Sequence, residues 1–192
     1  MNFACKSALA GAAFALGVAM TAASFVPGYA AETKMVGGAE MYPSKNIIQN
    51  AMNSKDHTTL VAAVKAAGLV ETLQGKGPFT VFAPTNEAFA KLPKGTVDTL
   101  LKPENKAQLA KILTCHVVAA NAMSAAIQKM IKDDGGAHKV KTVGGCMLTV
   151  KSAGGTIAIT DEKGQTAKVT IADVKQSNGV IHVIDTVLLP AG

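Results

Sequence analysis

The hydrophobic pattern of the chain changes its period near residue 140. Before that point apolar residues recur at helical spacing, as Leu60 and Val64 do, which is typical of helices with one buried face. After it they alternate with other residues, as Ile157 and Ile159 do, which is typical of strands with one wet face. A helix-rich half followed by an antiparallel sheet predicts the α+β fold class.

Prolines, glycines and capping residues set the expected limits of these elements. We expect helices over residues 47–54, 58–67, 86–92, 103–113 and 124–131. We expect strands over residues 79–83, 115–119, 140–143, 146–151, 156–160, 167–171 and 180–189. The last of these runs is apolar almost throughout, so we expect a central strand that is covered on both faces.

The first thirty residues have the three parts of a secretory signal. Lys6 is their only charge, residues 7–23 form an uncharged apolar core, and Gly28 and Ala30 place small residues before a cut. We therefore expect residues 1–30 to be a signal peptide, with no integral membrane anchor after its cleavage. The expected location of the exported chain is extracellular or periplasmic.

The remaining chain has the size of one ordinary domain. Residues 31–43 mix glycine, proline and polar residues, and we expect an N-terminal tail there. Residues 44–190 contain no internal repeat or low-complexity linker, so we expect a single domain.

Charge and composition limit the partners. The formal net charge is +6, and every basic residue is a lysine, because the sequence contains no arginine. Recognition of phosphates and bases depends on the paired donors of arginine and on stacking aromatic residues, and the chain also lacks tryptophan. We therefore expect no nucleic-acid partner, and a solvated positive surface that binds acidic polymers loosely.

Cys115 and Cys146 are the two cysteines that follow the expected cleavage site. In an oxidising compartment two such thiols favour a disulfide. A bridge that closes a loop of this length stabilises the fold by roughly 3 to 4 kcal/mol.

The sequence after the signal lacks the spacings that announce common catalytic sites, among them a glycine-rich phosphate loop, HExxH and GxSxG. Cys115 next to His116 invites a thiolate and base, but neighbouring residues on a strand point to opposite faces. His116 and His182 are too few ligands for zinc, so hydrogen-bonded core histidines are favoured. We expect no catalytic residues, no metal site and no cofactor.

Three segments, in the right order, together resemble the fasciclin-type domain family. Residues 79–89 (Phe-Thr-Val-Phe-Ala-Pro-Thr-Asn-Glu-Ala-Phe) resemble its first signature, residues 178–190 its second, and residues 112–118 its central tyrosine–histidine segment. The resemblance implies a wedge of two β-sheets with several helices packed against them. It also implies a secreted or surface protein without catalytic residues.

The tyrosine–histidine segment is the proposed adhesion contact of that family, and it corresponds here to His116, Val117 and Val118. Cys115 stands where the family has the tyrosine. This departure favours a bridge to Cys146 over an integrin-like contact.

Three hypotheses for the function remain. The first is a secreted or envelope-exposed adhesion or binding module whose partner is a cell-surface or matrix protein or a polysaccharide. The second is a carrier of a small ligand, which predicts a lined cavity between sheet and helices. The third is a thiol enzyme, which predicts a thiolate of depressed pKa, and we disfavour it because nucleophile, base and orienter are not brought together.

Overall fold

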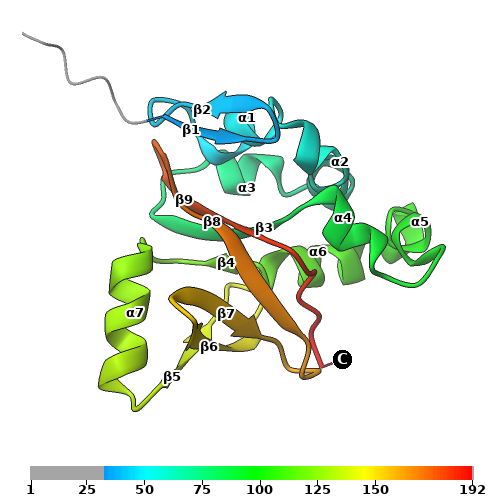
Figure 1. Cartoon of the computed structure of the whole chain (residues 1–192). Coiled ribbons are helices and arrows are strands. Elements are labelled where there is room, and N and C mark those ends of the chain that lie inside the picture. The colour runs from blue at the N-terminus through cyan, green and yellow to red at the C-terminus, as the bar shows by residue number, and fades with distance from the viewer. Residues whose placement is uncertain (1–32, 192) are drawn as a thin grey trace, which may run out of the picture. The chain divides into compact units, whose positions relative to one another are not determined.

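The computed structural model describes residues 33–191, and the expected signal peptide lies outside them. The helical elements are α1 (Ile47–Ala51), η1 (Lys55–His57), α2 (Thr58–Ala67), α3 (Val70–Gln74), α4 (Asn86–Ala90), α5 (Thr96–Leu100), η2 (Pro103–Asn105), α6 (Lys106–Thr114) and α7 (Ser124–Asp133) (Figure 1). The strands are β1 (Lys34–Val36), β2 (Ala39–Met41), β3 (Phe79–Pro84), β4 (Val117–Val118), β5 (Ala137–Lys141), β6 (Met147–Ala153), β7 (Thr156–Thr160), β8 (Thr166–Gln176) and β9 (Gly179–Ile184). Helices dominate the first part and strands the second, which confirms the α+β class.

The segment expected to be a tail, residues 31–43, contains a folded hairpin instead. Strands β1 and β2 pair antiparallel, and Val36 and Met41 are buried in the same apolar cluster as α1 and α2. The ammonium group of Lys34 donates a hydrogen bond to the carbonyl of Ala172 on β8 at 2.8 Å. Each strand of the hairpin is only three residues long, which is too short to give a clear alternating pattern in the sequence.

Seven strands form one sheet in the order β4-β3-β9-β8-β7-β6-β5. Neighbouring strands run antiparallel except β3 and β9, which are parallel with Phe79 opposite Gly179. The long strand β8 pairs with β9 along one part and with β7 along another, and its register shifts between Val169 and Val174. The domain therefore has one large sheet, whose two halves share β8, and the small β1–β2 sheet.

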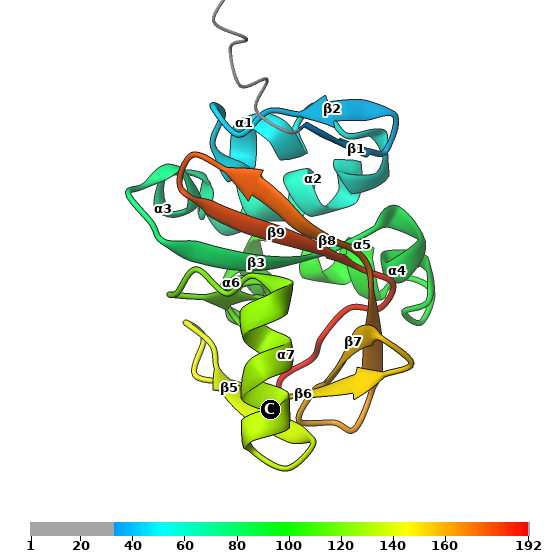
Figure 2. The ribbon, with the colours of Figure 1, turned by 60° about the vertical axis from the view of Figure 1, so that its left-hand side comes forward.

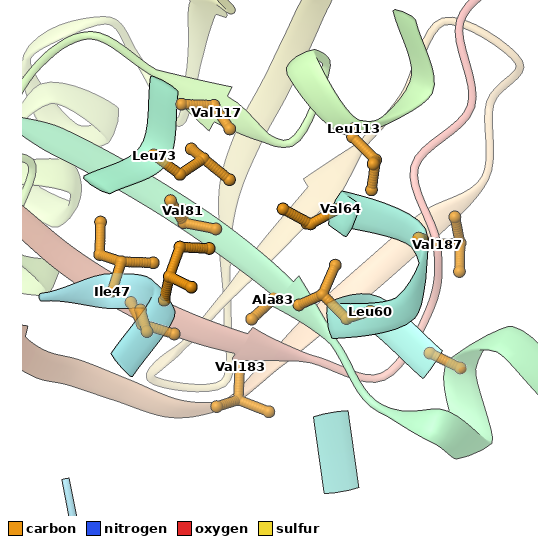
Figure 3. Close-up of a cluster of buried hydrophobic side chains, with 14 of the residues drawn as sticks. Ile47, Leu60, Val64, Leu73, Val81, Ala83, Leu113, Val117, Val183 and Val187 are labelled. Carbon is orange, nitrogen blue, oxygen red and sulfur yellow. The ribbon is translucent and has the colours of Figure 1, made fainter. Parts of the chain in front are cut away.

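Alternating side chains along β3 and β9 separate two apolar clusters. Val81 and Val183 belong to the first cluster, which is covered mainly by α1, α2, α3 and α6 (Figure 3). Phe82 and Ile184 belong to the second cluster, which fills the space between β3, β9 and the β6–β8 half of the sheet, with α7 packed against it (Figure 2). Each fully buried aliphatic or aromatic side chain contributes roughly 1.5 to 3 kcal/mol, so the covered central strands hold both layers together.

Two expected strands are shorter than predicted. Helix α6 continues to Thr114 and Cys115 caps it, which leaves only Val117–Val118 as strand. Strand β9 ends at Ile184. At Asp185 the backbone N–H still donates to the carbonyl of Lys168 at 3.2 Å, but the N–H of Lys168 donates to the Asp185 carboxylate at 2.8 Å. The chain then leaves the sheet toward its C-terminal end (Figure 1).

Candidate functional site

His116 lies between the end of α6 and β4, and only 2% of its surface is exposed. Its Nδ1 lies 2.8 Å from the carbonyl oxygen of Ile112, and its Nε2 lies 2.9 Å from the backbone nitrogen of Leu188. Because a carbonyl only accepts and an amide N–H only donates, Nδ1 carries the proton and Nε2 accepts. Burial lowers the pKa of His116 to about 4, so the ring is neutral at pH 7.

The predicted adhesion segment is buried along its whole length. The exposed fractions of His116, Val117 and Val118 are 2%, 5% and 8%. Val117 packs into the first apolar cluster and Val118 into the second. This burial leaves little side-chain surface for the expected adhesion contact, which stays a prediction, and it places His116 as a core histidine that joins α6 to the C-terminal segment.

Cys115 and Cys146 form a disulfide, and both residues are buried. The bridge connects the end of α6 with the residue just before β6. Beside it, the N–H of Val143 donates to the carbonyl of Val117 at 2.8 Å. The sulfur of Cys115 is therefore bonded to Cys146 and cannot act as a nucleophile with His116 as its base. Cys115 and His116 lie at the end of α6 and not on the strand that the sequence predicted.

A second buried histidine, His182 on β9, lies close to an aspartate and a serine. Its Nε2–H donates to the carbonyl of Ala122 at 2.8 Å, and its Nδ1 accepts the N–H of Asp173 at 3.3 Å. The carboxylate of Asp173 accepts the N–H of Ser124 at 2.6 Å and also the hydroxyl of Ser124. The serine is therefore hydrogen-bonded directly to the carboxylate. In a catalytic triad the serine hydroxyl is hydrogen-bonded to the histidine ring instead, and the carboxylate accepts a hydrogen bond from the other side of that ring.

The two histidines do not come together as metal ligands, because each ring uses both nitrogens in hydrogen bonds to backbone. Within residues 33–191 no group of three or more His, Cys, Asp or Glu side chains is placed to hold a metal ion.

A polar hollow of about 530 Å³ lies where α3 leads into β3, beside the turn between β8 and β9. We call it the amide hollow, because side-chain amides of Asn46, Gln74, Asn121 and Asn178 line it together with Lys76. The side chains of Gln74, Lys76 and Asn121 are exposed. They present hydrogen-bond donors and acceptors to solvent in one concave surface.

The floor of the amide hollow is held by Asn178. Its side-chain oxygen accepts the N–H of Ile47 at 3.1 Å, and its amide nitrogen donates to the carbonyls of Leu73 and Gly75 at 2.8 and 3.0 Å. A Cβ atom at Gly77 would lie 1.9 Å from the carbonyl oxygen of Asn178, so only glycine permits this close approach. The exposed groups are therefore carried on a fixed framework, although sequence analysis identified residues 178–190 only as a family signature.

A second concavity is apolar and has a volume of about 220 Å³. We call it the edge pocket, because it lies between the two edge strands of the sheet, β4 and β5, next to α7. Its apolar lining comes from Phe82, Val118, Ala120, Ile127, Met130 and Val140. Its rim includes His138, Lys139 and Lys141 of β5.

Comparisons with known proteins agree with this arrangement. The family model for the fasciclin domain matches residues 55–190. The chain is 46% identical over 159 residues to Protein sll1483 of Synechocystis sp., covering 83% of this chain and 81% of that protein. It is 37% identical over 145 residues to the cell surface glycolipoprotein MPB83 of Mycobacterium bovis, covering 73% of this chain and 58% of that protein.

A solved structure shares the fold. It is a FAS1 domain pair from the insect cell adhesion molecule Fasciclin I, with a TM-score of 0.54 and 24% sequence identity, covering 68% of this chain and 43% of that chain. With a family model matched over most of its length and a close relative of similar extent, the chain belongs to the fasciclin domain family.

Proposed function

We propose that this protein is an exported adhesion or binding module that acts through protein or polysaccharide contacts on its surface. Fasciclin domains are adhesion-related modules of secreted proteins. One relative is a cell surface glycolipoprotein, and the described residues contain no helix long and apolar enough to cross a membrane.

The amide hollow is the observation that carries this proposal. Its exposed Gln74, Lys76 and Asn121 can donate to and accept from sugar hydroxyls or a peptide backbone. Asn178 ties three chain segments together beneath them, so little order has to be gained when a partner binds. Polar groups on loops fixed by a rigid scaffold are the usual arrangement of a binding surface.

The proposal is tested with a double variant, Gln74→Ala with Asn121→Ala. Neither side chain supports the framework, so the fold should be kept. A matched control, Asn53→Ala with Gln108→Ala, removes the same two residue types from exposed positions elsewhere. Binding is measured on an array of bacterial surface polysaccharides and on intact bacterial cells.

We expect the wild-type protein and the control to bind, and the hollow variant to bind at least about tenfold more weakly, as the loss of one or two good hydrogen bonds implies. Two results would overturn the proposal. In one, folded wild-type protein binds neither polysaccharides nor cells. In the other, the hollow variant binds as well as the control.

The edge pocket supports the carrier hypothesis less well than the amide hollow supports a binding module. Small-molecule sites usually enclose about 300 to 1,000 Å³. The edge pocket, at about 220 Å³, lies below that range. A volume of this size suits side chains of a partner better than an enclosed ligand.

A further inference from the structure

The two edge strands of the sheet come together at one end only. There the N–H of Val143 donates to the carbonyl of Val117 at 2.8 Å, and the Cys115–Cys146 disulfide lies beside this bond. Beyond that point the edge pocket separates them, with Val118 and Ala120 on one side and β5 on the other. A sheet that starts to close and then opens leaves two strand edges facing a gap.

The backbone groups of β5 that face this gap follow from strand geometry. The N–H of Thr142 donates to the carbonyl of Cys146 at 2.9 Å, toward β6, and the N–H of Val143 points the other way, toward β4. Since N–H groups alternate in direction along a strand, those of Lys141 and Lys139 face the same side as that of Val143. They point away from the ladder with β6 and are available to a further strand.

The pocket next to these groups fits side chains. Its volume of about 220 Å³ accommodates one or two apolar side chains, and its lining is almost entirely apolar. In a strand added to β5, every second side chain would point to the same face of the sheet as Val140. One of these side chains would enter the pocket.

Charge at the rim adds a preference. The side chains of Lys139 and Lys141 are exposed, and because they alternate with Val140 along β5 they point to the face opposite the pocket. No Asp or Glu is among the described residues that line the pocket, and Asp134 at the adjoining helix end is paired with His138. In a bound segment, a residue next to the one that fills the pocket would point to the same face as the two lysines, so an acidic residue there would meet them.

We propose that the β5 edge binds an extended peptide segment of a partner protein as an added strand. A bulky apolar side chain of the segment fills the edge pocket, and an acidic residue lies near Lys139 and Lys141. Main-chain hydrogen bonds supply affinity in this mode, and the pocket supplies specificity. The inference rests on the proposed binding function and assigns it a peptide partner at the edge pocket, which adjoins the amide hollow at residues 120–122.

The test is a selection of displayed random peptides of about six to eight residues, the length of an ordinary strand, on the full exported protein. We expect selected peptides to share a large apolar residue with an acidic residue nearby. Their affinity is then measured for two variants of one position, Lys139→Pro and Lys139→Ala. Proline removes the outward N–H, and edge strands tolerate it there, whereas alanine keeps the N–H and removes only the charge.

Lys139→Pro should weaken binding about tenfold relative to Lys139→Ala, which is the loss of one main-chain hydrogen bond. If Lys139→Pro does not fold, the same peptides are N-methylated at alternate amides and tested on wild-type protein, with the same expected loss. The proposal is overturned if no peptide is selected, or if peptides bind equally well without these N–H groups. The two proposals fail separately. If polysaccharide or cell binding is lost with the Gln74 and Asn121 substitutions but kept in Lys139→Pro, the amide hollow binds a partner even if the peptide proposal is overturned.

Discussion

At the scale of single residues, the three buried histidines matter most. His57, His116 and His182 are almost fully buried, and burial lowers the pKa of each ring below its ordinary value. His116 connects α6 with a backbone N–H that lies 72 residues further along the chain. These two hydrogen bonds give the histidine of this segment a structural role that requires no contact with a partner.

This burial predicts a loss of stability in mild acid. The pKa of His116 falls from 6.5 in the unfolded chain to about 4 in the folded domain, so below pH 6.5 the unfolded state binds a proton that the folded state does not. The free energy of unfolding should therefore decrease as the pH falls from 6.5 to about 4, by about 3 kcal/mol from this residue alone. His57 and His182 add to the effect in the same direction.

Urea unfolding measured across this pH range checks the prediction. His116→Gln serves as the comparison, since glutamine keeps a donor and an acceptor but does not titrate. The variant should be less stable at pH 7 and should show a shallower decline toward pH 4. An equal decline in both proteins would remove His116 from the explanation.

Residue-level predictions from the sequence succeeded where the information is local. The sequence favoured a core histidine at position 116 and indicated Cys115 and Cys146 as a bridged pair, and the structure contains both features. The expectation that His116, Val117 and Val118 form an adhesion contact stays a prediction, and their burial under distant segments counts against it. His57 is also buried, and its Nδ1 lies 2.8 Å from the hydroxyl oxygen of Ser54.

At the scale of elements, α7 shows how a helix can be fixed from outside. Its N-cap residue, Met123, has no capping side chain, and the carboxylate of Asp173 on β8 accepts the N–H of Ser124 instead. Burial by itself raises the pKa of Asp173, but the hydrogen bonds from Ser124, together with smaller charge effects of His182 and Lys34, lower the net pKa. The carboxylate is therefore charged at neutral pH and stabilises the positive end of the helix dipole.

Removing this charge should loosen α7. Asp173 has a positive φ of 57°, so Asp173→Asn is the suitable change, because asparagine also tolerates this backbone conformation. We expect a loss of about 1 kcal/mol in the free energy of unfolding and faster amide hydrogen exchange in α7. Asp133→Asn at the other end of the helix, where Asp133 makes an exposed pair with Lys129, is the control and should change stability by less than about 0.5 kcal/mol. Equal exchange rates in the two variants would contradict this role of Asp173.

The limits of a helix or strand could be predicted where its own residues show a clear hydrophobic period. Helix 58–67 and strand 156–160 have the limits that the sequence predicted. The parallel pairing of β3 with β9 could not be predicted, because the partners lie about a hundred positions apart and both strands are short apolar runs. The amide hollow was missed for a similar reason, since it unites turns from separate parts of the chain.

At the scale of the whole domain, the disulfide connects the end of α6, which leads into edge strand β4, with the turn between edge strand β5 and β6. Cys115 and Cys146 are 31 residues apart, and the bridge lies next to the bond between Val143 and Val117. Replacing both cysteines with serine should lower the free energy of unfolding by roughly 3 to 4 kcal/mol, as expected for a loop of this length. Urea unfolding measures the change, and alkylation of the native protein with and without prior reduction provides the control. Alkylation without reduction would show that the thiols are free and would contradict the bridge.

The domain presents two concave surfaces that adjoin at residues 120–122, a polar hollow on a fixed framework and an apolar pocket between strand edges. Of the family's central histidine segment, only Val118 reaches either surface, as part of the lining of the edge pocket, while His116 and Val117 are buried in the core. We therefore expect partners to bind at the amide hollow and the edge pocket and not in the core.

The most direct test is to follow the backbone amide signals of the isotope-labelled exported protein by NMR while a binding surface polysaccharide is added. We predict shifts of the amide signals of residues 74–77, of Asn121 and of residues 176–179, with the ring signals of His116 unchanged. Shifts centred on residues 115–118, with the amide hollow unaffected, would contradict the account and return the contact to the histidine segment.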